Sequence, residues 1–79
     1  MELVELTEYI VKQLLGDIEF KVEMNEEDGI SIIKVLVPEE AMPKVIGKGG
    51  KIANSIRTIV QALAYTRKLG RVRVNIDSL

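Results

Sequence analysis

The segment Val45-Ile46-Gly47-Lys48-Gly49-Gly50-Lys51 holds three glycines and two lysines, and a third lysine, Lys44, precedes it directly. A strongly periodic helical pattern begins immediately after it. This combination predicts a tight backbone turn that leads into the N-terminus of a helix. Exposed N–H groups and the positive end of the helix dipole favour an anion at such a place. We therefore expect this turn to accept a phosphate group.

Glycine can serve such a turn in two ways, because it adopts positive φ easily and lets a ligand approach the backbone closely. The sequence does not reveal which of the three glycines does which. A plain loop between two helices also favours glycine, so that alternative stays open from the spacing alone, although the flanking lysines favour an anion site. A Walker-type phosphate loop is a poor match, because the spacing is too short for GxxxxGK(S/T) and Ile52 follows the last lysine.

The composition of the chain offers little for catalysis. Its 79 residues suffice for one small domain with a marginal core, which association would help. The absence of cysteine and histidine removes disulfides, the thiolate and imidazole metal ligands and the commonest general base. None of Ser31, Ser55 and Ser78 has a base nearby in the sequence. We expect no enzymatic activity, no cofactor and no metal.

The net charge of −1 conceals a division between the two halves of the chain. Residues 1–43 hold three lysines against eleven acids, a net charge of −8, and residues 44–79 hold eight Lys/Arg against one acid, a net charge of +7. Such asymmetry favours a polyanionic partner on one side of the molecule. The alternatives are that the fold interleaves the halves and cancels the field, or that opposite faces pair between molecules.

The start of the chain is acidic and contains no apolar run of signal-peptide or membrane-spanning length. We therefore expect a soluble, cytoplasmic protein with no membrane partner.

The first half of the chain has the pattern of a helix followed by two strands. Apolar residues at helical spacing predict an amphipathic helix over residues 2–15, which Gly16 ends. Apolar and polar residues then alternate over 18–25, as in a half-buried strand. A polar turn at 25–29 and a β-rich run over 30–37 complete a hairpin. Because the second strand is apolar on both faces, we expect it to be central or to meet a partner.

The second half has the pattern of two helices and a strand. The first helix is short, and Pro43 lies either near the end of its first turn or at its first position. A broad apolar stripe after Lys51 predicts a long helix, which Gly70 ends. Alternation then predicts a final strand over residues 71–76 with a basic outer row.

The glycine turn and the order of the elements together resemble a known family. The hexapeptide at 45–50, placed between two helices that strands flank, resembles the V/I-I-G-x-x-G signature of a KH domain. The stretches EYIVKQLL, VPEEAMPKVIGKGGKIANSIRTIVQAL and RVRVNID make the whole chain similar to the small bacterial RNA-binding proteins of the KhpA (YlqC-like) family. The resemblance implies an α+β fold over residues 1–79, a single type II KH domain of order α-β-β-α-α-β. Its three-stranded sheet would be covered on one face by three helices, with the GxxG loop at 47–50.

Three residues depart from the family pattern. Ile52 takes a place that is usually polar, and Ala53 takes the inward place often filled by isoleucine, so the floor of the groove could be shaped differently. Pro43 stands where such proteins commonly carry glycine, which leaves the start of the short helix open.

The resemblance implies that about four nucleotides of single-stranded RNA, or of single-stranded DNA, are clamped between the GxxG loop with its helices and the edge of the sheet. The residues carried over to that site are Lys44, Ile46, Gly47, Lys48, Gly49, Gly50, Lys51, Ala53, Asn54 and Arg57. The glycines would contact the sugar-phosphate backbone with Lys48 as the exposed charge. Lys44, Lys51 and Arg57 would add phosphate contacts by proximity, and Ile46, Ala53 and Asn54 would border the bases. Arg71 and Arg73 are added from the charge pattern alone, and a solvated strand face is their alternative.

Aromatic residues are few, since only Tyr9, Phe20 and Tyr65 occur and Phe20 fits the core pattern. RNA modules that stack bases on aromatic side chains are therefore a poor match. We expect weak, broadly tolerant RNA binding by a groove with aliphatic walls, in an RNA chaperone or post-transcriptional regulator.

The resemblance also implies a homodimer, or a heterodimer with a larger partner that carries its own KH domain. Apolar residues on the outer face of residues 30–36 and around Ile52, Ile59 and Tyr65 would offer an interface, with ordinary core as their alternative. The second functional hypothesis is accordingly a protein-interaction subunit that acts in cell elongation or division, with RNA binding secondary.

Overall fold

The structure, a computed structural model, describes residues 2–79 apart from the side chain of Lys48. Six main elements follow one another in the expected order α-β-β-α-α-β, so the predicted α+β fold is confirmed. They are α1 (Leu3–Leu15), β1 (Lys21–Glu27), β2 (Ile30–Val37), α2 (Met42–Ile46), α3 (Lys51–Thr66) and β3 (Val72–Ser78), with short 3-10 turns at Glu39–Ala41 and Lys48–Gly50.

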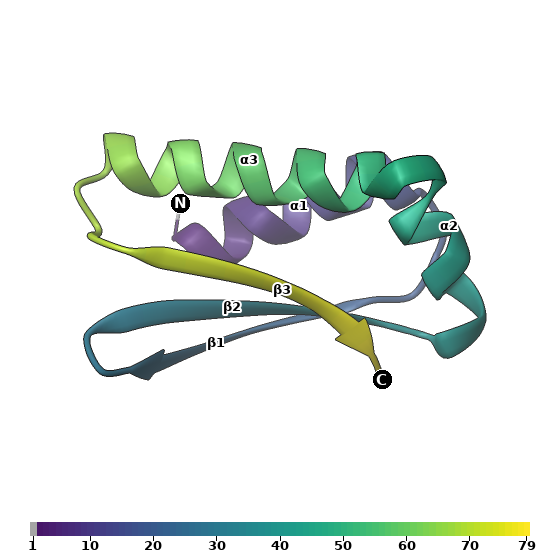
Figure 1. Ribbon diagram of the computed structural model, residues 1–79, viewed down its shortest axis with the longest axis horizontal. Helices are drawn as coiled ribbons and strands as arrows, with labels where there is room; N and C mark the ends of the chain where they lie inside the picture. The colour runs from purple at the N-terminus through teal and green to yellow at the C-terminus, as the bar shows by residue number, and fades with distance from the viewer. Residues whose placement is uncertain (1) are drawn as a thin grey trace.

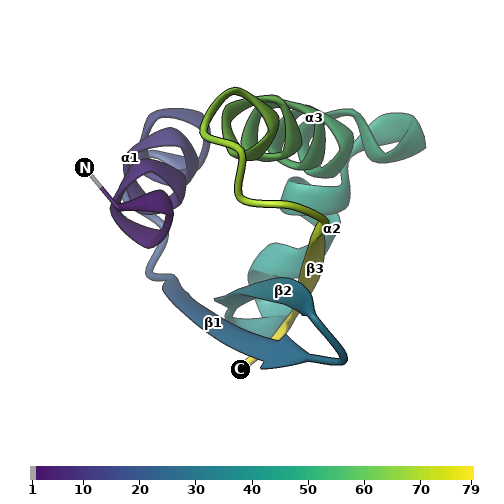
Figure 2. The same ribbon diagram turned by 90° about the vertical axis from the view of Figure 1, so that its left-hand side faces the viewer.

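The three strands form one sheet in the order β1-β2-β3. β1 runs antiparallel to β2, and β3 runs parallel to β2, so β2 is the central strand as its two apolar faces indicated. All three helices lie on one face of this sheet, and the other face is open (Figure 1, Figure 2). On the open face, Ile30, Ile32 and Leu36 are only half-buried.

The core lies between the sheet and the helices. The inward row of β2 is fully buried, and α1, α2, α3 and β3 each contribute apolar side chains against it. The buried hydrophobic cluster comprises Leu3, Val11, Leu15, Ile33, Val35, Val37, Val45, Ile56, Val60, Ala64 and Val74. Thr7 also lies on the inward face of α1 and is fully buried. Its hydroxyl tolerates burial because it donates a hydrogen bond of 2.8 Å to the carbonyl of Leu3.

The hairpin between β1 and β2 is tighter than the sequence pattern predicted. The expected strand at 18–25 begins instead at Lys21, and the expected polar turn at 25–29 is reduced to Asp28-Gly29. Both turn residues have positive φ, 50° and 78°, as a two-residue Asp-Gly hairpin requires. The polar residues just before the turn pair with β2, so β1 extends to Glu27 as an exposed strand.

The end of α3 also differs from the prediction. The helix stops at Thr66, four residues before Gly70, and Lys68 takes a positive φ of 55°. The N–H of Leu69 bonds to the carbonyl of Ala64, and the N–H of Lys68 bonds to that of Tyr65, each at 3.1 Å. This is a Schellman termination in which lysine occupies the left-handed position that glycine usually fills.

The start of α2 falls between the two alternatives that the sequence allowed. A 3-10 turn follows Pro38, and α2 begins at Met42, so Pro43 lies in the first turn, where its missing N–H costs no hydrogen bond.

Candidate nucleic-acid interface

The glycine turn, residues 47–50, depends on its glycines for its backbone conformation, and Gly47 and Gly49 are exposed. Gly47, Gly49 and Gly50 all have positive φ, of 61°, 67° and 70°. A Cβ atom on Gly49 would meet nothing within 4 Å, and one on Gly47 or Gly50 would make only ordinary contacts. All three glycines therefore serve the turn conformation, and open space lies above Gly49.

The helix that follows begins in a way that suits an anion. Gly50 is the N-cap of α3, and among the described residues no side chain caps this end and no acid lies in the first turn. Lys51 instead occupies the first helical position and is exposed. A cation there opposes the helix dipole, whose positive end favours negative charge. A bound phosphate would supply the negative charge that the side chains at this helix end do not.

Lys44, which the family resemblance placed at the phosphate, has acidic neighbours. It is exposed and lines a shallow pocket together with Glu19 and Glu40. Their carboxylates compete with any phosphate for its ammonium group. Lys48, the expected exposed charge of the turn, has a side chain outside the described residues.

A polar row on α3 connects the glycine turn with β3. The amide nitrogen of Asn54 lies 3.6 Å from the position of a Cβ on Gly50. The Nη1 atom of Arg57 donates a hydrogen bond of 2.9 Å to Oδ1 of Asn54, and its Nε atom donates one of 3.3 Å to the carbonyl of Val74. One helical turn further on, Nε2 of Gln61 donates to the carbonyl of Val72 at 3.3 Å.

The hydrogen bonds of Arg57 and Gln61 fix the position of α3 relative to β3, the edge strand of the sheet. A guanidinium group has five N–H donors, and these two bonds use only two of those of Arg57. The others remain available to a ligand, from a side chain whose position is already fixed. Gln61 was not among the predicted site residues, because its partner is a backbone carbonyl, which leaves no trace in the sequence pattern.

The apolar residues predicted beside the bases differ in exposure. Ile46 is 46% exposed at the end of α2, just before the glycine turn, and it can meet a ligand. Ala53 is buried at 9% and packs inward, so only the edge of its methyl group could contribute. Ile52, one of the departures from the family pattern, is half-buried and packs against the core cluster.

Charge is segregated across the molecule. β1 and β3 are the opposite edges of the sheet, α1 packs beside β1, and α3 packs beside β3 (Figure 2). Most acids of the first half lie on α1, β1 and their connections, and most bases of the second half lie along α3 and β3. The halves meet at two places, where Lys44 lies beside Glu19 and Glu40 and where Arg67 lines a pocket with Glu2 and Glu5.

Within residues 2–79, no helix is long and apolar enough to cross a membrane. The same described residues contain no group of three or more acidic, histidine or cysteine side chains that could hold a metal ion.

Two solved structures resemble this fold. The crystal structure of APE1850 matches with a TM-score of 0.61 at 26% identity over 86% of this chain. Era, in a crystal structure with MgGDPNP and nucleotides 1506–1542 of 16S ribosomal RNA, matches over 100% of this chain with a TM-score of 0.62 at 21% identity, a likeness of fold alone. The chain spans 48% of APE1850 and 32% of Era.

Similar sequences match over most of their own length. RNA-binding protein KhpA of Caldanaerobacter subterraneus subsp. tengcongensis is 46% identical over 66 residues, which cover 81% of this chain and 87% of that protein. RNA-binding protein KhpA of Clostridium perfringens is 48% identical over 63 residues, which cover 76% and 81%. The family model described as KhpA/KhpB, KH domain, matches residues 4–76. The chain therefore belongs to the KhpA/KhpB family of KH domains.

Proposed function

We propose that this protein binds single-stranded RNA and holds its sugar-phosphate backbone at the glycine turn. The observation that carries the proposal is the arrangement around Gly50. An exposed turn with three positive-φ glycines leads into an uncapped helix end with a lysine at its first position. Asn54 and Arg57 continue from it to β3. The related KhpA proteins, which are named RNA-binding proteins, support this reading.

In this proposal the phosphates lie over Gly47–Gly50, where the absence of side chains lets them approach the backbone. Lys48 and Lys51 supply positive charge, and the unused donors of Arg57 bind a further phosphate. The bases lie over Ile46 and beside Asn54. Because this part of the site contains no aromatic side chain, base identity contributes little, and binding is weak and tolerant of sequence.

Lys44 and Ala53 contribute least. Lys44 lines a pocket together with two acids, whose negative charge weakens its attraction for a phosphate, and Ala53 is nearly covered. Both belong to the proposed site only at its margin.

In the cell, we propose a role as an RNA chaperone or post-transcriptional regulator, in the cytoplasm. A second copy of this chain, or a larger protein with its own KH domain, would join two grooves and raise the effective affinity without new contacts to RNA. The outer sheet face with Ile30, Ile32 and Leu36 and the exposed α3 residues Ile59 and Tyr65 are the surfaces available for such pairing.

One observation favours the second candidate function, that of a protein-interaction subunit. Ile59 is 40% exposed in the middle of α3, on a helix whose inner residues are fully buried. A partner that covers this face would act through assembly, with RNA binding secondary.

Titration with RNA at two salt concentrations separates the two functions. A labelled, unstructured RNA dodecamer is titrated with the protein, and its fluorescence anisotropy gives Kd. Four phosphate contacts on a single strand predict a slope of log affinity against log salt of about −3, so affinity should fall about 50-fold between about 50 mM and about 200 mM salt. Binding that is undetectable or insensitive to salt would exclude the RNA clamp and leave the interaction subunit.

A further inference from the structure

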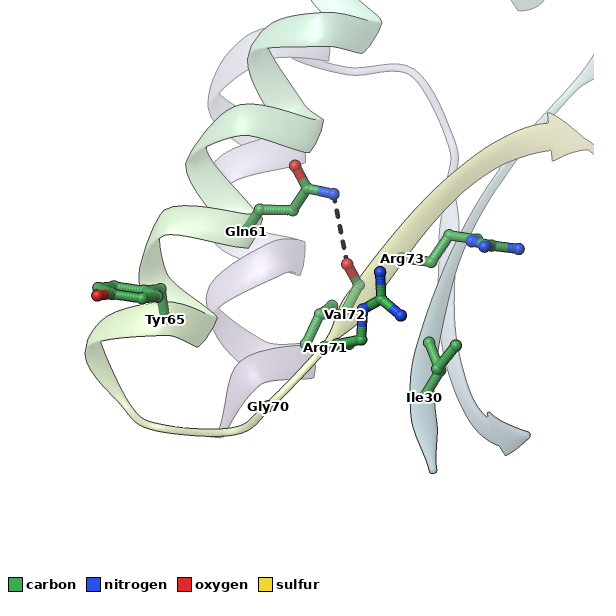
Figure 3. A pocket seen from close by; sticks show the side chains of 7 residues that line it. All are labelled: Ile30, Gln61, Tyr65, Gly70, Arg71, Val72 and Arg73. Carbon is green, nitrogen blue, oxygen red and sulfur yellow. Dashed lines mark hydrogen bonds between the residues drawn. The ribbon is translucent and has the colours of Figure 1, made fainter. Parts of the chain in front are cut away.

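A second polar pocket lies at the opposite end of α3 from the glycine turn. It encloses about 360 Å³ between the last turns of α3 and the start of β3. Figure 3 shows its walls, which come from α3, from β3, from the connection between them and from the start of β2. They are Ile30, Gln61, Tyr65, Gly70, Arg71, Val72 and Arg73.

A glycine and a hydrogen bond between α3 and β3 define the shape of this pocket. Gly70 has a φ of 78°, and a Cβ there would meet nothing within 4 Å, so this wall is bare backbone facing open space. The hydrogen bond from Gln61 to the carbonyl of Val72 ties α3 to β3 beside it (Figure 3). The pocket is therefore a defined depression between two connected elements.

Three of the lining side chains have binding capacity that the fold does not use. Tyr65 is 84% exposed, the most exposed large apolar side chain among the described residues. Arg71 and Arg73 are exposed, and within residues 2–79 neither guanidinium group has an ion-pair or hydrogen-bond partner. In the view of Figure 3, Arg71 lies between Tyr65 and Arg73.

A pocket that is lined by an aromatic ring and by two free guanidinium groups suits one ligand class. Nucleotides offer both a base that can stack on an aromatic or guanidinium plane and a phosphate that guanidinium binds in a bidentate manner. An acidic protein segment would use the arginines but would leave the ring without a stacking partner. The combination favours nucleic acid.

The pocket also lies in line with the glycine turn. Asn54, Arg57, Gln61 and Tyr65 follow one another at spacings of three and four residues, which places them on one face of α3. At 1.5 Å per residue, Tyr65 lies about 16 Å along the helix from Asn54. A strand that leaves the glycine turn along this face reaches the pocket after passing the polar row.

We propose that this pocket is an additional nucleotide subsite, in which Tyr65 stacks on the base of a nucleotide beyond the four at the glycine turn while Arg71 and Arg73 bind its phosphates. The subsite rests on the proposed RNA-binding function and extends it. It gives the protein a longer footprint on RNA than the glycine turn alone. The proposal also gives a role in base stacking to Tyr65, one of only three aromatic residues in the chain.

The test compares RNA lengths. A labelled tetranucleotide and octanucleotide of uridine, and the same pair of adenosine, are titrated against the wild-type protein and its variants at one salt concentration. The wild type should bind the octamer more tightly than the tetramer. Tyr65→Ala should weaken octamer binding by about tenfold, the loss expected from one stacked base, and leave tetramer binding unchanged. Tyr65→Phe, which keeps the ring, should bind both lengths as the wild type does.

The arginines give an independent readout. Arg71→Gln combined with Arg73→Gln should make the salt slope of octamer binding shallower by about 1.4, from two lost phosphate contacts, with no change for the tetramer. Because these side chains are exposed and unpaired, circular dichroism and melting temperature should stay at wild-type values.

Other outcomes overturn the subsite and distinguish its failure from that of the RNA clamp. Equal affinity of the wild type for both lengths, or an equal loss for both lengths in Tyr65→Ala, refutes the subsite while tetramer binding upholds the clamp. A change of sedimentation coefficient in Tyr65→Ala with unaltered octamer binding would make this surface a protein interface. Absence of any binding by the wild type would remove the clamp and the subsite together.

Discussion

Replacing Gly49 by aspartate, with asparagine as the matched control, separates the charge of the glycine turn from its shape. The backbone of Gly49 has φ 67° and ψ 17°, within reach of the left-handed region that Asn and Asp tolerate best among non-glycine residues. A Cβ there meets nothing within 4 Å, so neither side chain collides with the protein. The two variants should fold alike and differ only by one negative charge.

The expected magnitudes follow from the same geometry. Left-handed backbone costs a non-glycine residue about 1 kcal/mol, so both variants should melt about 4–8 °C below the wild type. If the phosphate of a bound RNA lies about 6 Å from the carboxylate, their repulsion amounts to about 0.7 kcal/mol in a water-like dielectric and about 3 kcal/mol at an effective value of 20. Gly49→Asp should therefore bind RNA about 3- to 100-fold more weakly than Gly49→Asn.

The assay is anisotropy with a labelled octanucleotide at low salt, and thermal melts of the three proteins serve as the folding control. The difference between Asp and Asn should shrink as salt is added, because ions screen an exposed charge. Equal affinities of the two variants at low salt would mean that no phosphate approaches Gly49, and the proposed clamp would then be wrong.

Three further substitutions follow from individual contacts. Lys68→Gly should raise the free energy of unfolding by about 0.5–1 kcal/mol, because it relieves left-handed strain at the end of α3; an unchanged melting temperature would contradict this. In Arg57→Lys, the single ammonium group cannot bond both Asn54 and the carbonyl of Val74, as the guanidinium group does. The variant should bind RNA several-fold more weakly, and its free energy of unfolding in chemical denaturation should be lower by about 1 kcal/mol. Lys44→Ala should weaken RNA binding less than Lys51→Ala does, because Glu19 and Glu40 line the same pocket as Lys44; the reverse order in the same titration would show that Lys44 is the main phosphate ligand.

The order of elements followed from local chemistry. A β-rich run that is apolar on both faces identified β2 as a strand, and the sheet places it in the centre. Gly16 ends α1 at the expected position. These features depend on residues close together in the chain, so sequence patterns can report them.

The errors arose where a long-range or unusual contact outweighed a local preference. The pairing of β1 with β2 drew polar residues before Asp28 into the ladder, although their composition favoured a turn. Lys68 follows the end of α3 in a left-handed conformation that usually marks a glycine, so the sequence pattern predicted the end at Gly70.

The candidate site was predictable to a similar extent. The glycines identified the turn, because its backbone conformation uses positive φ at all three of them. The connection from Asn54 through Arg57 to β3 was not predictable, because one of its partners is a backbone carbonyl brought close by the fold. The contact of Gln61 was not predictable either, because its partner is also a backbone carbonyl. Tyr65 and the arginines of β3 line one pocket only in the folded chain.

The most direct measurement is a titration of uniformly ¹⁵N-labelled protein with an unlabelled RNA tetranucleotide, followed by the shifts of its backbone amide resonances. The account predicts that the largest changes fall on residues 47–51, on the Asn54 and Arg57 side of α3 and on the adjoining edge of β3, with α1 and β1 unaffected. Changes concentrated on α1, on β1 or on the open face of the sheet, with the glycine turn unmoved, would contradict it.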